Sequence, residues 1–277
     1  MTSNFLLTGL PRSGTTWASR AIVSALNGRL VHEPFNWKRY PERVGYHMRY
    51  LTASSSDEGL DEIYSKALRP GITDLFHPNR RIIVKDVHIC LAVEHLWANF
   101  KPRIIIMMRH PCALASSWRQ LELEARSRIE LLLSQEALLS TYLAPFVDHL
   151  TSREGYYFDI GAYWGASYFV LDGISKRHPD WLWSSHENLC VDSLNSYLKL
   201  LHDLGLSDDD VHIQRLKRYL TRHDRAGNAQ GHPYSLTRKT SREPEKWREM
   251  LSSAEIDAVL RGAERFGMLQ KLGDLLG

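Results

Sequence analysis

A short apolar run that leads through a glycine-containing turn into a helix constrains this sequence more than any other feature. Residues 5–8 (Phe-Leu-Leu-Thr) have the composition of a buried strand, and residues 15–26 carry apolar side chains at helical spacing. Gly9 and Gly14 lie between them, and their backbone freedom allows a tight loop. In such a strand–loop–helix unit, backbone N–H groups and the positive end of the helix dipole face one point. The pattern predicts a phosphate-binding loop.

Further strand-like runs predict the rest of the fold. Near-continuous apolar stretches occur at residues 29–31, 81–84, 103–108 and 181–183. Helices are expected at 15–26, 89–98, 113–150 (one or two, interrupted near Pro145), 159–176, 191–204 and 245–261. Strands of this kind that alternate with helices are typical of a central parallel sheet flanked by helices. Without repeats or a low-complexity linker, the 277 residues are interpreted as a single α/β domain, 1–277.

Composition excludes several classes of protein. The formal net charge of +3 is too small for a protein that coats nucleic acid, but it suits an enzyme that receives anions. The three cysteines form no CxxC pair, which argues against a zinc site or a disulfide framework and for a reducing compartment. No apolar run approaches the roughly 20 residues of a membrane span, and no leader is evident, so a cytoplasmic location is expected. Most histidines outside recognisable motifs, among them His47, are scattered and expected at the surface, and no metal is assigned.

The loop differs from a nucleotide-triphosphate loop in one informative way. Gly9 and Gly14 have the G-x-x-x-x-G spacing, but Thr15 and Thr16 follow where such a loop has Lys and then Ser or Thr. A basic residue, Arg12, stands inside the loop instead. Phosphoryl transfer from ATP normally uses that lysine together with Mg²⁺. A sulfuryl group carries one negative charge fewer, so cationic side chains can manage its transfer without metal.

The segment 11–17, Pro-Arg-Ser-Gly-Thr-Thr-Trp, resembles the 5′-phosphosulfate loop of the sulfotransferases that use 3′-phosphoadenosine 5′-phosphosulfate (PAPS). The resemblance implies a P-loop NTPase-like fold and PAPS as the donor, with the desulfated nucleotide PAP as product. It also implies donor-binding roles for the loop residues Arg12, Ser13, Gly14, Thr15, Thr16 and Trp17. Trp17 would stack on the adenine, although a plain core role is the alternative.

A second motif agrees with the first. Arg109 follows the apolar run 103–108, and Ser117 comes eight positions later in the next helix. An arginine and a serine so spaced form the 3′-phosphate site in the same family. The planar guanidinium of Arg109 offers several donors to one phosphate. The alternative is an arginine that only ends a strand.

Two later segments resemble the family more weakly. In residues 183–189, His186 occupies the place of the family's tyrosine near the adenine. In the basic segment 222–244, Arg238 and Lys239 resemble residues that close over the 3′-phosphate, and a solvated loop is the alternative. The resemblance covers residues 4–36 and 81–119 as the nucleotide-binding core, and 180–204 and 235–260 less clearly.

Two residues compete for the role of general base. Glu33, in the sequence His-Glu-Pro-Phe, resembles the catalytic glutamate of the carbohydrate and tyrosylprotein branches. His88 resembles the histidine of the cytosolic branch, where Lys-x-His is usual, but here one extra residue separates it from Lys85. Arg12 and Glu33 together favour the carbohydrate-type pattern and Glu33 as base. Lys85 or Arg12 would stabilise the leaving oxygen, while a salt-bridged strand end is the alternative for Lys85 and Asp86.

The sequence therefore predicts a sulfotransferase that transfers a sulfuryl group from PAPS to a hydroxyl, or an amine, of a carbohydrate or other small metabolite. Residues 40–78 and 120–165 are expected to build the acceptor cleft. Nucleic acid is not expected as a partner. Two other functions remain open: a small-molecule kinase or other P-loop NTPase, and a non-catalytic nucleotide-binding protein of the same fold.

Overall fold

The computed structural model describes residues 4–71, 80–206, 209–225 and 243–276. These residues fold into two compact units. The first comprises residues 1–107, 179–184 and 193–222, and the second comprises 108–178, 185–192 and 223–277. The interpretation of the chain as one domain stays a prediction.

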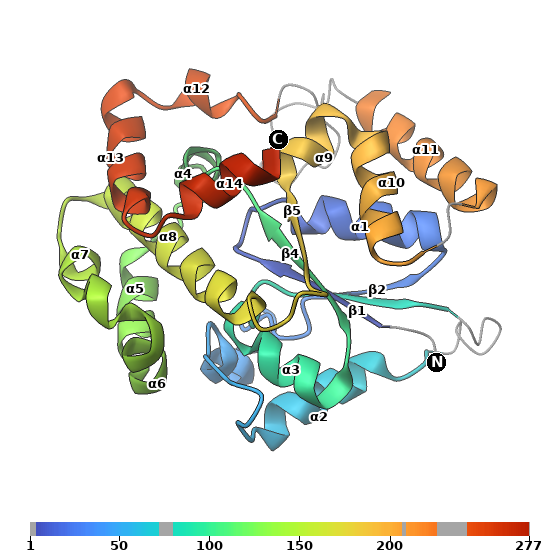
Figure 1. Ribbon diagram of the computed structural model, residues 1–277, viewed down its shortest axis with the longest axis horizontal. Helices are drawn as coiled ribbons and strands as arrows, with labels where there is room; N and C mark the ends of the chain where they lie inside the picture. The colour runs from blue at the N-terminus through green and yellow to red at the C-terminus, as the bar shows by residue number, and fades with distance from the viewer. Residues whose placement is uncertain (1–3, 72–79, 207–208, 226–242, 277) are drawn as a thin grey trace. The chain divides into compact units, whose positions relative to one another are not determined.

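A five-stranded sheet dominates the first unit (Figure 1). Its order is β2-β3-β1-β4-β5, with β1 at Phe5–Gly9, β2 at Arg29–His32, β3 at Ile82–Lys85, β4 at Arg103–Met108 and β5 at Leu182–Ser185. The pairs β1–β3, β1–β4 and β2–β3 are parallel, which confirms the predicted sheet. Every residue of β1 is buried, as expected for a central strand covered on both faces.

Helices cover this sheet on both sides. In Figure 1, α1 and α10 lie above the sheet, and α2 and α3 lie below it. The bounds are α1 Thr15–Leu26, α2 Glu58–Leu68, α3 Val93–Phe100, α10 Ser193–Asp203 and α11 Asp210–Arg225, with short 3₁₀ turns at Pro41–Tyr46 (η1) and Cys90–Ala92 (η3). The P-loop-like strand–loop–helix unit predicted at the start of the chain is therefore present as β1–α1.

The register aligns the carboxyl ends of β1, β2 and β3. Lys85 of β3 lies opposite Leu7 of β1 and opposite His32 of β2. Because the strands are parallel, the segments that follow them leave from the same edge of the sheet. The loop after Gly9 and the segment that begins at Glu33 therefore leave the sheet at that one edge.

The second unit is helical. Its elements are α4 Pro111–Arg119, α5 Arg126–Leu133, α6 Glu136–Leu138, the π-helical turn η4 Leu139–Leu143, the 3₁₀ turn η5 Ala144–Phe146, α7 Val147–Thr151, α8 Tyr156–Ser175, α9 His186–Val191, α12 Trp247–Met250, α13 Ser253–Glu264 and α14 Met268–Leu276. The prediction of one or two long helices over 113–150 was wrong. The Trp118 carbonyl accepts the N–H groups of both Leu121 and Leu123, so α4 ends there.

Glycines bring α8 and α13 together at the centre of this unit. A Cβ atom on Gly161 would lie 1.9 Å from the carbonyl oxygen of Val259, and one on Gly262 would lie 2.2 Å from that of Phe158. Such spacing is possible only without a side chain, since real Cβ atoms need more than 3 Å. Because α8 is buried along almost its whole length, this close packing forms the unit's core.

Candidate active site

The loop between β1 and α1 is tightly curled. A Cβ atom on Gly9 would lie 2.3 Å from the Met107 carbonyl oxygen, so only glycine lets β1 end beside β4 here. Arg12 (φ 76°) and Gly14 (φ 86°) both take left-handed conformations. For Arg12 this conformation has an energetic cost, which is common at binding loops.

The first turn of α1 is suited to hold an anion. The buried Ser13 directs both its N–H and its hydroxyl to the Leu10 carbonyl oxygen, at 3.1 and 2.7 Å, and so shapes the loop. Gly14 is the N-cap of α1, and within the described residues no side chain caps this helix end. First-turn N–H groups have no partner within their own helix, so those of residues 14–16 are suited to bind an anion. The binding of a donor by the loop residues 12–17 stays a prediction.

Trp17 is mostly buried. Its side chain is 6% exposed, and its ring meets the ring of Tyr197 on α10 edge to face, with centroids 5.4 Å apart. This contact fixes the ring against the helix layer and accounts for a core role. Stacking on an adenine stays a prediction.

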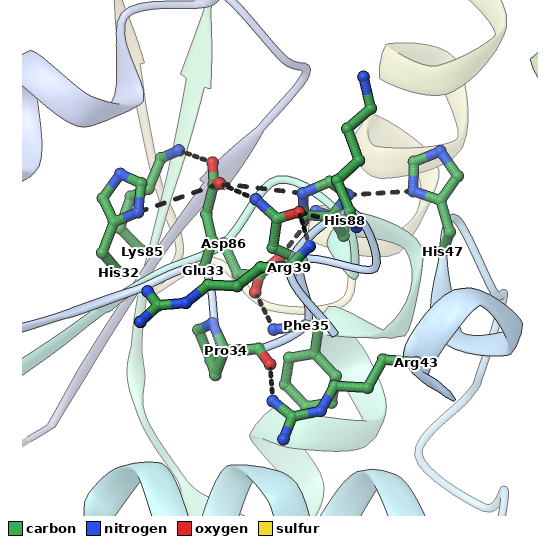
Figure 2. A network of polar contacts seen from close by, with 12 residues as sticks. His32, Glu33, Pro34, Phe35, Arg39, Arg43, His47, Lys85, Asp86 and His88 are labelled. Carbon is green, nitrogen blue, oxygen red and sulfur yellow. Dashed lines mark hydrogen bonds and ion pairs between the residues drawn. The ribbon is translucent and has the colours of Figure 1, made fainter. Parts of the chain in front are cut away.

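The ends of β2 and β3 bring three of the predicted catalytic residues together (Figure 2). Glu33 has a left-handed backbone (φ 49°), and its N–H donates to the Lys85 carbonyl oxygen at 2.7 Å. Its Oε1 pairs with the ammonium of Lys85, whose side chain is only 3% exposed. Its Oε2 accepts from Asn36 Nδ2 at 2.8 Å and lies 3.9 Å from His88 Nε2.

These neighbours keep the Glu33 carboxylate ionised. Burial alone would raise the pKa of Glu33, but the neighbouring His88 ring, whose Nε2 lies 3.9 Å from Oε2, and the positive charge of Lys85 outweigh it. The pKa therefore lies well below its ordinary value. His32 Nδ1 lies 4.0 Å from Glu33 Oε2. Burial, followed by the positive charge of Lys85, lowers the pKa of His32. At neutral pH, the Glu33 side chain is therefore a carboxylate that is paired with the ammonium of Lys85.

Asp86 ties the two strand ends together. Its side chain is fully buried, with Oδ2 accepting from Phe35 N at 2.8 Å and Oδ1 from His88 N at 2.7 Å. Burial raises its pKa, while the backbone hydrogen bonds from Phe35 and His88 oppose that rise. Lys85 pairs with Glu33, so the strand end does carry a salt bridge, and the catalytic role of Lys85 stays a prediction. By holding the backbone at His88, Asp86 accommodates the extra residue of the Lys-x-x-His spacing.

Sequence reasoning missed one member of this cluster. His47, expected at the surface, is 8% exposed, and its Nδ1 lies 3.2 Å from Nδ1 of His88. The Met48 N–H donates to the His88 carbonyl oxygen at 2.6 Å, which draws the segment after η1 onto the loop after β3. No spacing in the sequence signals this contact, because 41 residues separate the two histidines.

The second unit holds the other predicted motif. Arg109 directly follows β4, and Ser117 lies on α4, as predicted. The Arg109 carbonyl oxygen accepts from Trp164 Nε1 at 2.8 Å, which fixes this residue against α8. Its side chain is 9% exposed. The convergence of Arg109 and Ser117 on a phosphate stays a prediction.

A buried glutamate, Glu187, supports the start of α4. Its Oε1 accepts from His110 N at 2.9 Å, and burial raises its pKa although that hydrogen bond and the charge of Arg109 act against the rise. His110 stacks on Trp247, with ring centroids 4.6 Å apart. Burial, followed by the charge of Arg248, lowers the pKa of His110 to about 4, so this imidazole is neutral at pH 7.

The remaining predicted contacts are less defined. His186 is buried beside Cys190, whose Sγ lies 3.6 Å from His186 Nε2, and its contact with a nucleotide stays a prediction. Arg238 and Lys239 lie outside the described residues. Within the described ranges, no group of His, Cys, Asp and Glu side chains could hold a metal ion. No helix in that same part of the chain is long and apolar enough to cross a membrane.

No family model and no curated protein matches the chain. Among solved structures, it is similar to mouse sulfotransferase SULT7A1 complexed with PAP, at 15% identity over 98% of this chain and 89% of that one, with a TM-score of 0.45. It is also similar to the sulfotransferase domain from the curacin biosynthetic pathway (11% identity, 94% and 97% covered, TM-score 0.48). A third is sulfotransferase STF9 from Mycobacterium avium (10%, 97% and 77%, TM-score 0.49). All three similarities are low in both sequence identity and TM-score.

Proposed function

We propose that this protein is a sulfotransferase that takes a sulfuryl group from PAPS and transfers it to a hydroxyl or amine of a small polar acceptor. The observation that carries the proposal is the pair of ionised side chains, Glu33 and Lys85, at the edge of the sheet where the phosphate loop begins. A carboxylate can take a proton there, and an ammonium can stabilise a developing negative charge. The resemblance of residues 11–17 and of Arg109 with Ser117 to the family's motifs supports PAPS as the donor.

The loop fits the charged end of such a donor. The N–H groups at the start of α1 and the guanidinium of Arg12 would hold its 5′-phosphosulfate, and Arg109 and Ser117 would hold its 3′-phosphate. When bound, PAPS supplies the sulfuryl group and a nucleotide phosphate as leaving group. The carbohydrate and tyrosylprotein branches share the pattern of Arg12 with Glu33, and we place this chain nearer to them.

Glu33 is assigned as the general base and Lys85 as the residue that stabilises the leaving oxygen. While Lys85 is paired with Glu33, it keeps the carboxylate ionised but weakly basic. When the ammonium turns toward the leaving oxygen, the pKa of Glu33 rises, because the nearby positive charge that lowers it moves away. The carboxylate then accepts the proton of the acceptor hydroxyl more readily. His88 is the alternative base.

The acceptor is proposed to be a carbohydrate or other small polar metabolite bound by residues 40–78 and 120–165. Within the first range, Tyr40 carries the guanidinium of Arg43 over its ring at 3.9 Å, and Trp37 just before it carries the ammonium of Lys38 at 5.8 Å. Aromatic rings together with basic side chains suit a sugar or other polar acceptor.

Thermal-shift measurements separate this function from the alternatives. PAP without Mg²⁺ should raise the melting temperature, whereas ATP with Mg²⁺ should have little effect. The reverse result would refute the sulfotransferase and support a kinase or NTPase. Transfer of radiolabelled sulfate from PAPS to a panel of sugars, phenols, lipids and peptides then tests catalysis. A protein that binds PAP but transfers to no acceptor in the panel would favour the non-catalytic alternative.

A further inference from the structure

Two buried histidines face each other through the same ring nitrogen. His47 and His88 approach with their Nδ1 atoms 3.2 Å apart, and their ring centroids are 5.3 Å apart at an interplanar angle of 57° (Figure 2). A distance of this length is a hydrogen bond, so a single hydrogen lies between the two nitrogens. The tautomers of the two rings are therefore linked, because the ring that donates and the ring that accepts must differ.

The position of the hydrogen decides what the other nitrogen of His88 can do. If His47 donates through its Nδ1–H, neutral His88 carries its hydrogen on Nε2. If His88 donates through its own Nδ1–H, its Nε2 is a bare acceptor. Nε2 of His88 points toward the Glu33 carboxylate, with Oε2 3.9 Å away.

The Glu33 carboxylate favours the first arrangement. A bare Nε2 would place a nitrogen lone pair toward carboxylate lone pairs in a site from which water is largely excluded, and the two would repel. An Nε2–H would point a positive hydrogen at the same oxygen. The distance exceeds a direct hydrogen bond of about 2.9 Å, so a small movement on ligand binding would complete it.

Both rings are held in place from the backbone. Asp86 accepts from the His88 N–H, and His88 in turn accepts the Met48 N–H at its carbonyl oxygen. The ring of Trp37 lies near His47, with centroids 6.1 Å apart. The charged groups that face His88 are thus Glu33 after β2 and Asp86 after β3, and Lys85 reaches the far oxygen of Glu33.

We propose that His47 is a positioning residue that holds neutral His88 in the Nε2–H tautomer. His88 is then a donor to the Glu33 carboxylate and, in the resting state, not a base. The proposal rests on the proposed function only in giving the base role to Glu33; the tautomer itself is independent of the reaction catalysed. It removes His88 as the alternative base, because a base at this position needs a bare Nε2.

Nuclear magnetic resonance of the protein with ¹⁵N-labelled histidine tests the tautomer without any substrate. The spectrum is recorded at a pH of about 8.5, at which a free imidazole is neutral, and the two nitrogens of a neutral ring differ strongly in ¹⁵N shift. We expect His88 to show a protonated Nε2 and a bare Nδ1. A protonated Nδ1 on His88 in the native protein would overturn the proposal.

Two substitutions at His47 provide the matched pair. His47→Asn can keep an N–H near the position of Nδ1 and should preserve the His88 tautomer. His47→Phe removes that N–H and leaves only the Glu33 carboxylate, 3.9 Å away, to favour Nε2–H, so the share of the Nδ1–H tautomer should rise measurably. His95, which is buried and bonded to Asp61 at 2.9 Å, is the control, since His95→Asn should leave the His88 signals unchanged. An unchanged His88 tautomer in a folded His47→Phe variant would contradict the role of His47. If that variant does not fold, the native spectrum still decides.

Kinetics give a second readout. With PAPS and an active acceptor, His47→Phe should lower kcat by about 10-fold, a part of the 10²–10⁴-fold that a positioned base contributes, and His47→Asn should restore most of it. The affinity for PAP should stay the same in both. An equal loss in both variants would argue against positioning through the tautomer. If the tautomer is as expected but the native protein transfers no sulfate, the proposed function fails and the assignment of the His47–His88 pair stands.

Discussion

Replacing Lys85 by methionine tests whether the Lys85–Glu33 pair contributes to stability as the structure indicates. The Lys85 side chain is 3% exposed, so its charge depends on Glu33 for compensation. Breaking a buried ion pair by removing one partner costs about 3–5 kcal/mol. Lys85→Met should cost less, about 2–3 kcal/mol, because the remaining carboxylate is 14% exposed and keeps the hydrogen bond from Asn36.

Glu33→Gln should lower the free energy of unfolding by more, about 3–5 kcal/mol, because it leaves the better-buried ammonium of Lys85 without its partner. The double variant should then lose less free energy of unfolding than the two single variants lose together, by about 2 kcal/mol. This difference is the coupling energy of the pair. Urea unfolding followed in parallel by tryptophan fluorescence and far-ultraviolet circular dichroism measures the free energy of unfolding. The chain has two compact units, so coincidence of the two signals is needed before one free energy is derived.

The pH dependence provides an independent check with a definite sign. The folded-state pKa of Glu33 lies below its value in the unfolded chain, about 4.3. The pair therefore stabilises the protein fully above about pH 5, and this contribution is lost as the pH falls below that range. The double variant should lose less stability than the native protein between pH 7 and pH 3. A coupling energy within about 0.5 kcal/mol of zero, or equal acid sensitivity of both proteins, would refute the reasoning.

Three further predictions concern the base, the donor-binding arginine and the packing of α8 against α13. Glu33→Gln should lower kcat for sulfate transfer by about 10²–10⁴-fold while leaving the dissociation constant for PAP, measured by calorimetry, nearly unchanged. Arg109→Ala should weaken PAP binding by about 10- to 100-fold, because a charge-assisted hydrogen bond contributes about 1.5–3 kcal/mol, and equal weakening by both variants would contradict the separate roles of base and donor-binding residue. Gly161→Ala should reduce the free energy of unfolding by about 1–3 kcal/mol, since its methyl group would overlap the Val259 carbonyl oxygen. An unchanged urea midpoint would mean that α8 and α13 separate more easily than their close packing indicates.

The sheet could be predicted from the sequence because its strands are continuous apolar runs bounded by turns. The observed strands at Phe5–Gly9 and Arg103–Met108 lie within one residue of the predicted ranges. The helices between residues 120 and 150 could not be placed with the same success. Residues 120–150 are rich in leucine and glutamate, which favour helix throughout, and tertiary contacts divide them into short pieces with a π-helical turn at Leu139–Leu143.

The site was predictable where motif and strand end coincide. Glu33 and His88 appeared as competing candidates in the sequence. In the structure, His88 Nε2 lies 3.9 Å from the Glu33 carboxylate. The relative position of Glu33 and His88 could not be predicted. It depends on the hydrogen bonds that Asp86 accepts from the backbone N–H groups of Phe35 and His88. His47 was interpreted as a surface residue, since neither spacing nor hydrophobic pattern reveals that Met48 binds the loop after β3.

The side chain of Asp86 has a mechanical consequence. By accepting N–H groups from Phe35 and His88, one carboxylate links two loops, so a ligand that displaces one must displace the other. The amides of these two residues should then exchange with deuterium at the same slow rate and be released together. The chain after Asn36 is not held by this carboxylate. Substitutions there can change which acceptors bind, while Glu33 and His88 keep their relative geometry.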